Sequence, residues 1–330
     1  MNLLKSDYIN QNDKELVQLF VSSSTTKKYI LGINKLTKSV QKHIEVDGII
    51  DDFTRVQRSR KKEVLKIEEV PKDALILWTA TGSPLEVKHR LDKMGFKHIS
   101  YLALCKYSTL DLVHPPFIMD FKEDFAKHRE EYDGVYKLLA DEKSRSVFEK
   151  VINFKISFDY EFMDGFTNNH EGQYFDKEIL PEIKNIRFVD GGGYVGDTAT
   201  EVIKHYPDFS KLYLIEPIPE NIRIAKRELG EYENIEFLTC GVSDKKETLY
   251  FNEEKSFSTI YGSGTQSVEV DTIDNIVKEK VDYIKLDIEG AEQDAIEGAK
   301  ETIQKYKPIL AICIYHKAED WYRIPQKVLA

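Results

Sequence analysis

The stretch "RFVDGGGYVGDTATEVIKHYP" covers residues 187–207. It predicts a short apolar strand, an aspartate, a glycine-rich turn and then a helix. Gly191, Gly193 and Gly196 give the spacing G-x-G-x-x-G, which lets a ligand approach the backbone and the helix N-terminus. The pattern is weak by itself, because a tight strand-to-helix turn without a ligand uses the same glycines. It leaves open a dinucleotide, another adenosyl cofactor or no ligand.

The residues around this turn favour a cationic adenosyl ligand. Asp190 directly precedes the glycines, where a carboxylate would repel a pyrophosphate and attract a sulfonium that carries an α-ammonium group. Asp197 opens the helix, where an acid also complements the helix dipole. Glu216 ends the next strand, 20 residues after Gly196, and can accept both ribose hydroxyls of NAD or S-adenosylmethionine. Asn221 caps the following helix or orients the ligand.

The third strand of the same pattern ends in "FLTCGV". Gly241 and Val242 follow it, where backbone groups would meet the edge of an adenine. Cys240 has no evident histidine partner nearby, so a nucleophilic role is not expected. Further upstream, Gln173 and Tyr174 precede the domain and are predicted to help close the site.

The fourth strand ends in a cluster of acids, in "YIKLDIEGAEQDAIEGA" at residues 283–299. Asp287, Glu289 and Glu292 crowd the strand end and the helix start, where one of them can be poised as a base. They could also hold a divalent cation through oxygen ligands, although no metal is predicted. Alternatively, Glu292 only complements the helix dipole. His316, at the end of the fifth strand "ILAICIYH", is either structural or takes a proton from a substrate hydroxyl.

Length and composition set the frame for these motifs. The 330 residues are enough for two domains, and no apolar run approaches a membrane span. The N-terminus lacks the pattern of a secretory signal, and the three cysteines are far apart, so a reducing, cytoplasmic compartment is expected. Residues 1–115 contain 19 Lys and Arg against 14 Asp and Glu, whereas the remainder contains 28 against 43. That acidic part is a poor match for a nucleic-acid backbone.

The chain is predicted to fold as α/β, with a first domain over residues 1–115, a helical linker over 116–180 and a second domain over 181–330. In the first domain, strands are expected at 28–34, 46–53 and 73–81, and a fourth is expected after the helix stop at Gly95, in "FKHISYLAL". Cys105 is expected to lie in an apolar, strand-like run. In the second, a helix is expected over 291–306, and a hairpin is expected around Gly262–Gly264. The basic run "RVQRSRKK" at 55–62 is interpreted as a solvated loop rather than a phosphate site.

Residues 186–316 resemble the FkbM family of S-adenosylmethionine-dependent methyltransferases. The resemblance rests on "FVDGGGYVGDT", "LIEPIPEN", "VDTID" and above all "IKLDIEGAEQDAIEGA" with "PILAICIYH", and it extends upstream to about residue 140. It implies a class I methyltransferase-type doubly wound sheet and methyl transfer (EC 2.1.1), commonly to a hydroxyl of a glycan, sugar nucleotide or metabolite. The short sequence after His316 suggests that the last strand pair of such a sheet is lacking, as in a truncated chain.

Residues 28–104 look like the small Rossmann-like domain that precedes some sugar-modifying transferases. Of a glycine turn only Gly32 remains there, so no nucleotide is assigned to it, and the domain docks a sugar nucleotide, another subunit in a homo-oligomer, or nothing. Two other functions stay open for the whole chain. One is an NAD-dependent oxidoreductase, which Asp190 and the lack of a Tyr-x-x-x-Lys pair disfavour; the other is a non-catalytic binding protein that retains the fold.

Overall fold

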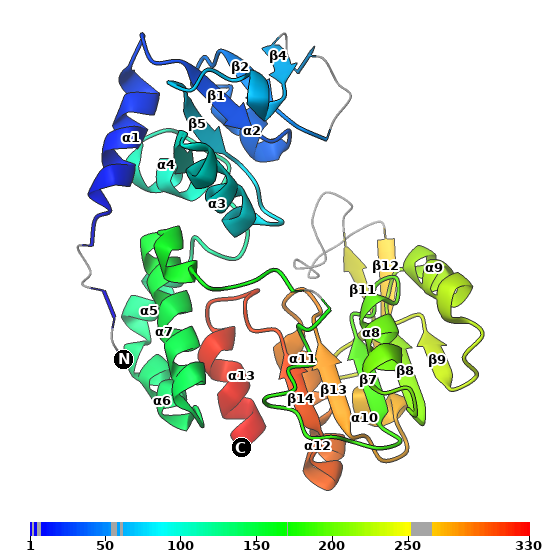
Figure 1. The fold of residues 1–330 in the computed structure, drawn as a ribbon. Helices are drawn as coiled ribbons and strands as arrows, with labels where there is room; N and C mark the ends of the chain where they lie inside the picture. The colour runs from blue at the N-terminus through cyan, green and yellow to red at the C-terminus, as the bar shows by residue number, and fades with distance from the viewer. Residues whose placement is uncertain (2, 5–7, 54–57, 60–61, 170, 252–265) are drawn as a thin grey trace. The chain divides into compact units, whose positions relative to one another are not determined.

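The structure, a computed structural model, describes residues 1, 3–4, 8–53, 58–59, 62–169, 171–251 and 266–330. The chain divides into two compact units, residues 1–168 and 169–330, each built around its own parallel sheet (Figure 1). The sequence predicted three segments, 1–115, 116–180 and 181–330, and this finer division stays a prediction. Among the described residues, no helix combines the length and the apolar character that crossing a bilayer requires.

The N-terminal unit contains a sheet in the order β3-β4-β2-β1-β5-β6. Its strands are β1 (Lys28–Leu31), β2 (Gly48–Ile50), β3 (Arg58–Ser59), β4 (Lys62–Leu65), β5 (Leu75–Trp78) and β6 (Lys97–Ser100). All neighbours run parallel except β3 and β4. The strands predicted within 28–34, 46–53 and 73–81 are therefore confirmed. Of the basic run at 55–62, residues 55–57 and 60–61 lie outside the described residues, and Arg58–Ser59 form the short edge strand.

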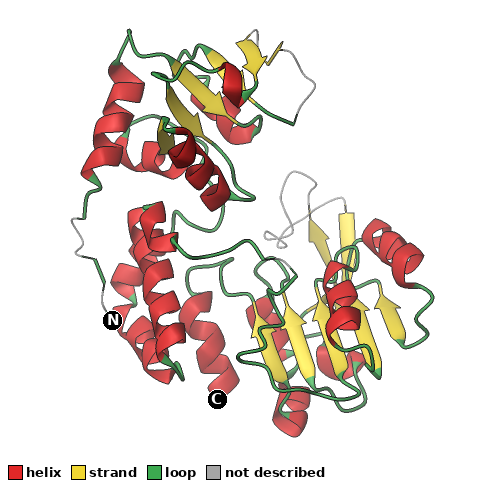
Figure 2. Ribbon diagram, in the orientation of Figure 1, coloured by secondary structure: helices red, strands yellow, loops and turns green. Residues whose placement is uncertain are grey.

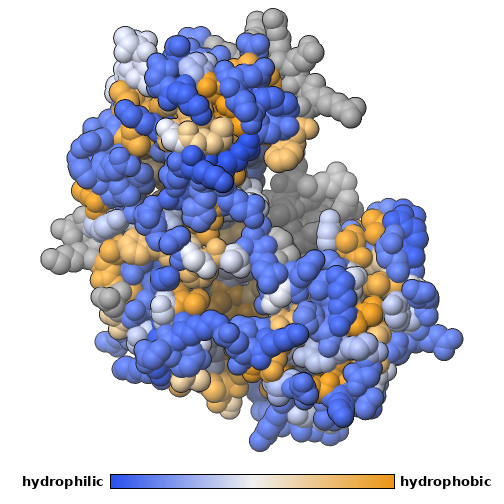
Figure 3. Space-filling view, viewed as in Figure 1, coloured by the Kyte–Doolittle hydropathy of each residue, from blue (hydrophilic) through white to orange (hydrophobic). Residues whose placement is uncertain are grey.

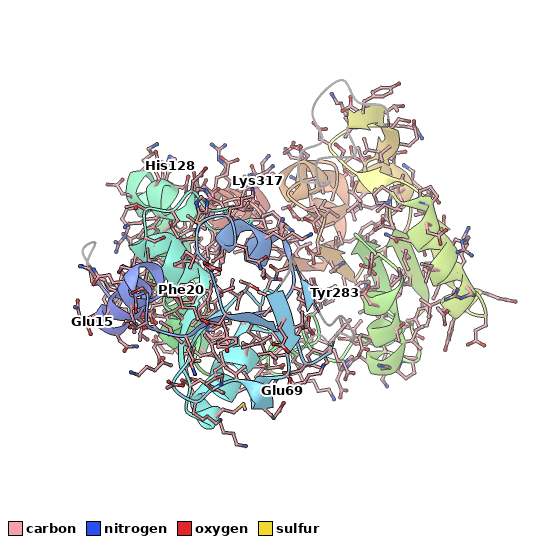
Figure 4. The ribbon with its side chains drawn as sticks, turned by 90° about the horizontal axis from the view of Figure 1, so that it is seen from above. Glu15, Phe20, Glu69, His128, Tyr283 and Lys317 are labelled. Atoms are coloured by element: carbon pink, nitrogen blue, oxygen red, sulfur yellow. The ribbon has the colours of Figure 1, made fainter. Side chains whose placement is uncertain are left out.

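Helices cover both faces of this sheet (Figure 2). One buried cluster joins it to α1 (Gln11–Ser22), α2 (Lys35–Val40) and α4 (Tyr101–Tyr107), and another joins it to η1 (Ile67–Glu69) and α3 (Pro84–Met94). Helix α1 is amphipathic: Glu15 lies on its outer side and Phe20 points toward the core (Figure 4). Burial of such apolar faces is what holds short helices in place.

The predicted fourth strand is too long. Strand β6 ends at Ser100, and residues 101–107 form α4, so Cys105 lies in a helix and not in a strand. The Ser100 hydroxyl accepts a hydrogen bond from the backbone N–H of Ala103 and caps that helix. The apolar run "YLAL" is buried without a helical period, which is why the sequence could not separate a strand from a helix here.

The predicted helical segment after residue 116 is present in the N-terminal unit. It comprises α5 (Phe121–Lys127), α6 (Arg129–Leu138), α7 (Glu142–Ser157) and the 3₁₀ turn η2 (Tyr160–Met163). Phe121, Phe125 and Tyr132 pack edge-to-face or stacked, with ring centroids 4.9–6.1 Å apart. This aromatic cluster gives the helices a core of their own.

In the described part of the C-terminal unit, the main sheet has five parallel strands in the order β14-β13-β7-β8-β9. They are β7 (Arg187–Gly191), β8 (Lys211–Ile215), β9 (Ile235–Leu238), β13 (Tyr283–Leu286) and β14 (Ile309–Ile312). The chain order reverses at β7, which makes the carboxyl ends of β7, β8 and β13 the expected ligand crevice. After β14 the chain continues into α13 (Asp320–Leu329) rather than another strand.

The two faces of this sheet bury alternate residues of its strands. Phe188, Leu212 and Leu214 pack against α8 (Asp197–His205) and α9 (Pro219–Leu229). Val189, Tyr213 and Ile284 pack on the other side, where α10 (Ile273–Ile276), α11 (Glu292–Glu297), α12 (Lys300–Tyr306) and α13 lie. The outward side of α9 is mostly hydrophilic (Figure 3), so only its inner side belongs to the core.

The predicted hairpin is confirmed. Strand β11 (Glu247–Phe251) pairs antiparallel with β12 (Gln266–Asp271), which also pairs parallel with β10 (Gly241–Val242). Gly262–Gly264 lie outside the described residues. The single helix predicted over 291–306 is wrong, because it breaks at Gly298 into α11 and α12. A Cβ at Gly298 would lie 2.0 Å from the Ser243 carbonyl oxygen, so this close approach requires glycine and interrupts the helix.

Candidate active site

The glycine turn after β7 is shaped by packing. The backbone N–H groups of Gly192 and Gly193 both donate to the carbonyl oxygen of Ile215 at the end of β8. Gly192 has φ +77°, and a Cβ there would lie 2.0 Å from the backbone oxygen of Asp287. Gly196 has φ +91° and sits against Leu229 of α9. These glycines are therefore needed for the turn to fit between neighbouring segments, whether or not a ligand binds.

A buried ion pair lies beneath the turn. Lys285 Nζ lies 2.9 Å from Asp190 Oδ1, and also donates to the carbonyl oxygens of Gly191 and Gly192. Both side chains are buried. Burial disfavours the charge of Lys285, but the attraction of Asp190 raises the pKa of this lysine. Among the described residues, Lys285 is thus the cation beside Asp190. Asp190 is linked to the carbonyl oxygens of the turn through this lysine.

Glu216 is held rigidly at the end of β8. Its carboxylate accepts hydrogen bonds from the backbone N–H groups of Tyr194 and Ile218, at 3.1 and 3.0 Å, and from the side-chain amide of Asn221, at 3.1 Å. Ile218, not Asn221, occupies the N-cap position of α9, since Pro219 begins the helix. The capping role considered for Asn221 is therefore wrong, and this residue instead orients Glu216.

A cavity of about 790 Å³ opens at the carboxyl ends of the strands. Its wall includes most of the residues that the sequence predicted for the site: Gln173, Tyr174, Asp197, Glu216, Asn221, Gly241, Val242, Asp287 and Glu289. Other predicted residues are not part of the wall as described: Asp190, Gly191, Gly193, Gly196 and His316. The predicted residues therefore fall into two groups, those that line the cavity and those that do not.

Asp287 directly follows β13 and is hydrogen-bonded to two tyrosines. Its two carboxylate oxygens accept hydrogen bonds from the hydroxyls of Tyr174, at 3.0 Å, and Tyr315, at 3.1 Å. Burial, together with neighbours that include Asp287, raises the pKa of both phenols, so both keep their proton at neutral pH. Tyr174 thus lines the cavity beside Asp287, and its role in binding stays a prediction.

His316 lies among three carboxylates. It follows the end of β14 by four residues instead of ending that strand, as the sequence had suggested. Its Nδ1 lies 3.0 Å from Glu292 Oε1, and its Nε2 lies 3.5 Å from Asp287 Oδ1 and 3.8 Å from Glu289 Oε2. Burial opposes the imidazolium, but the contact with Glu292 and the other carboxylates raises the pKa of His316.

Sequence reasoning missed Lys285 and the buried role of Glu292. Lys285 is the one charged residue of the strand "YIKL", a signal that it faces a partner inside the fold. Glu292 is fully buried at the start of α11, where its Oε1 accepts from the Ile288 N–H. A purely dipole-related role would leave such a side chain exposed, so this alternative does not describe Glu292.

Comparisons with known proteins agree with this geometry. Residues 190–328 match the family model described as the methyltransferase FkbM domain. Among solved structures, the crystal structure of methyltransferase FkbM from Methylobacillus flagellatus matches with a TM-score of 0.75 and 21% identity, over 97% of this chain and 87% of that one. No curated protein matched the chain. The fold class is confirmed, and the C-terminal unit contains a methyltransferase domain of the FkbM family.

Proposed function

We propose that the C-terminal unit binds S-adenosylmethionine and methylates a hydroxyl oxygen. The observation that carries this proposal is Glu216. Three hydrogen bonds fix its carboxylate at the wall of the cavity, one strand away from the glycine turn. A carboxylate in this position suits the two hydroxyls of an adenosine ribose. Gly241 and Val242 lie on the same wall, where their backbone suits an adenine edge.

The residues of the glycine turn are suited to bind the amino-acid end of the methyl donor. Asp197 lines the cavity at the first position of α8, and Gly192 and Tyr194 line it beside the turn. Asp190 contributes indirectly, since it holds Lys285, which in turn binds two carbonyl oxygens of the turn. A preorganised backbone of this kind loses little freedom when a ligand binds. S-adenosylmethionine supplies an electrophilic methyl group for in-line displacement.

The acceptor hydroxyl would lie against Asp287 and Glu289, which both line the cavity. Much of the acceleration would come from positioning the two reactants, with a carboxylate taking the hydroxyl proton late. His316 is buried and is not among the residues that line the cavity, whereas both carboxylates are. We therefore assign His316 to holding the two carboxylates in place through its Nε2, and assign proton transfer to Asp287 or Glu289.

The charge of the cavity favours a neutral or cationic acceptor over a sugar nucleotide. Its described wall contains seven carboxylate residues and two lysines: Glu171, Asp197, Glu201, Glu216, Asp287, Glu289 and Asp294 against Lys285 and Lys317. Lys285 is already paired with Asp190, and Lys317 Nζ donates to the Gly290 carbonyl oxygen. A diphosphate would meet mostly like charge there. Incubation with labelled donor should therefore methylate neutral glycans or polyols before nucleotide sugars.

Ligand-induced stabilisation tests the donor assignment. The melting temperature of the chain is measured with S-adenosylmethionine, S-adenosylhomocysteine, NAD or buffer alone. A hundredfold excess over the dissociation constant adds about 2.7 kcal/mol, which corresponds to a rise of about 5 °C or more for either adenosyl compound. Glu216→Gln should abolish the rise. Glu220→Gln, on the exposed side of α9, is the matched control and should keep it. A rise with NAD alone would refute the proposal.

A further inference from the structure

Two segments that are distant in sequence, the β13–α11 connection and the β14–α13 connection, bring potential metal ligands together beside the cavity. Asp287 follows β13, Glu292 is the first residue of α11, and His316 lies between β14 and α13. One side-chain ligand atom from each lies within 4.8 Å of the other two. Glu289 Oε2 lies close by, 3.8 Å from His316 Nε2. An imidazole nitrogen with two or three carboxylate oxygens is a recognised ligand set for a divalent cation.

The surplus of negative charge supports a cation at this place. His316 supplies at most one positive charge, whereas Asp287, Glu289 and Glu292 supply three negative ones within 4 Å of its ring nitrogens. Glu292 is 0% exposed, so water cannot screen its charge. A buried carboxylate such as that of Glu292 is stable when it is protonated, paired or bound to a metal.

A second observation is independent of the clustering. Glu292 Oε1 accepts a hydrogen bond from the Ile288 N–H, but Glu292 Oε2 is buried and has no hydrogen-bond partner among the described residues. Buried carboxylate oxygens without a partner are expensive. A cation bound between Glu292, Asp287 and His316 would give this carboxylate a further partner.

We infer that Asp287, Glu292 and His316 form a binding site for a divalent cation of the Mn²⁺ type. Carboxylate and imidazole ligands without a thiolate suit divalent first-row cations, and Mn²⁺ is the member of this group that serves as a spectroscopic probe. The inference goes beyond the proposed function, because binding needs neither methyl donor nor acceptor. Since Asp287 and Glu289 line the cavity, a cation held there would reach an acceptor hydroxyl and could lower its pKa.

Electron paramagnetic resonance of Mn²⁺ tests the site directly. The full chain is treated with a chelator, desalted and titrated with Mn²⁺, and the decrease of the free-ion signal is measured. One saturable site per chain is expected. Glu292→Gln and Asp287→Asn should each weaken binding at least tenfold. Glu297→Gln is the matched control, because it makes the same change in α11 at a side chain that is 50% exposed.

The outcomes separate this inference from others. Circular dichroism verifies that each variant is folded, and Asp287→Asn, at a side chain that is 26% exposed, serves if Glu292→Gln does not fold. No saturable binding, or binding that survives both substitutions, would overturn the site. The thermal shift with S-adenosylhomocysteine is measured on the same samples. Loss of Mn²⁺ binding with an intact shift shows that the two ligands depend on different residues.

Discussion

Both units have a glycine turn after a central strand, but side chains fill the turn in the N-terminal unit and a cavity borders it in the C-terminal unit. In each sheet the chain leaves a central strand through a glycine with positive φ, Gly32 at +111° after β1 and Gly192 at +77° after β7, and then enters a helix. In the N-terminal unit Asn34 fills the turn: its side chain accepts from two N–H groups of α2 and donates to the Thr79 carbonyl oxygen. In the C-terminal unit the turn borders a cavity.

The comparison shows that a glycine turn at a strand end reverses the chain and does not by itself make a site. What matters is whether neighbouring side chains occupy the space above the turn. Thr37 and Thr79 complete the closure in the N-terminal unit, with their hydroxyl oxygens 3.0 Å apart. At the corresponding place in the other sheet, Glu216 turns its carboxylate toward the turn and leaves the cavity open.

The largest expected difference between the turns follows substitution of their glycines. An added Cβ at Gly192 lies 2.0 Å from a backbone oxygen, whereas at Gly32 it lies 2.7 Å from the Thr79 hydroxyl oxygen, a side-chain atom. We expect Gly192→Ala to lower the free energy of unfolding by about 4 kcal/mol and Gly32→Ala by about 2 kcal/mol.

Urea unfolding can follow each unit separately, because Trp78 lies in the first and Trp321 in the second. Replacing one tryptophan by phenylalanine leaves the fluorescence of the other as the probe. If the two alanine variants lose the same free energy of unfolding, backbone strain alone accounts for the loss, and the contact of the added Cβ with Asp287 contributes little.

A buried charge distinguishes the second turn from the first. Lys285→Met removes the partner of Asp190 and leaves a carboxylate in the core, so we expect a loss of about 3–5 kcal/mol in the C-terminal unit. Adding Asp190→Asn should recover a large part of this loss. A double-mutant cycle from urea unfolding, read from Trp321, measures the coupling. Additive effects would mean that the pair is not coupled.

Removal of the Asn34 side chain should have a smaller effect, confined to the first unit. Asn34→Ala deletes the cap of α2 and the bond to Thr79, which costs about 1–2 kcal/mol. The unfolding of this unit is read from Trp78 in a Trp321→Phe background. The thermal shift with S-adenosylhomocysteine should stay as in the parent chain, and a loss of that shift would contradict separate roles for the two turns.

The smallest expected effect compares two buried lysines. The pKa of Lys285 is raised by Asp190, whereas burial lowers the pKa of Lys155 in α7 to about 8. Unfolded Lys155 titrates near 10.5, so the folded state gives up its proton first, and stability increases as the pH rises from about 8 to 10.5. Lys155→Met should therefore stabilise the N-terminal unit at pH 7, by about 1 kcal/mol.

The stability gained by Lys155→Met should shrink as the pH rises above about 8 and vanish near 10.5. Thermal melts of the parent and variant between pH 7 and 10.5 measure it. Lys150→Met, at an exposed position of the same helix, is the control and should show no such trend. A constant difference between parent and Lys155→Met would contradict the lowered pKa.

The sequence predicted the parallel strands well, because each is a short apolar run bounded by polar or glycine residues. It failed where the signal depends on distant contacts. The break at Gly298 is set by the Ser243 carbonyl, and the helical state of Cys105 by the cap at Ser100. Within the site, positions of Glu216 and Asp287 followed from their strands. The partners of Asp190 and His316 could not be read, since Lys285 and Glu292 meet them only in the folded sheet.

The pairing of Lys285 with Asp190 has a consequence for strand alignment. The two residues are direct neighbours across β13 and β7, although 95 positions separate them in the chain. A slip of β13 by one residue would turn Lys285 to the opposite face of the sheet, into a layer formed by Val189, Ile284 and Ile296. Apolar strands such as these tolerate several alignments, but a buried charge tolerates one. The ion pair therefore selects the register of the central strands, and with it the place where Asp287 emerges beside the glycine turn.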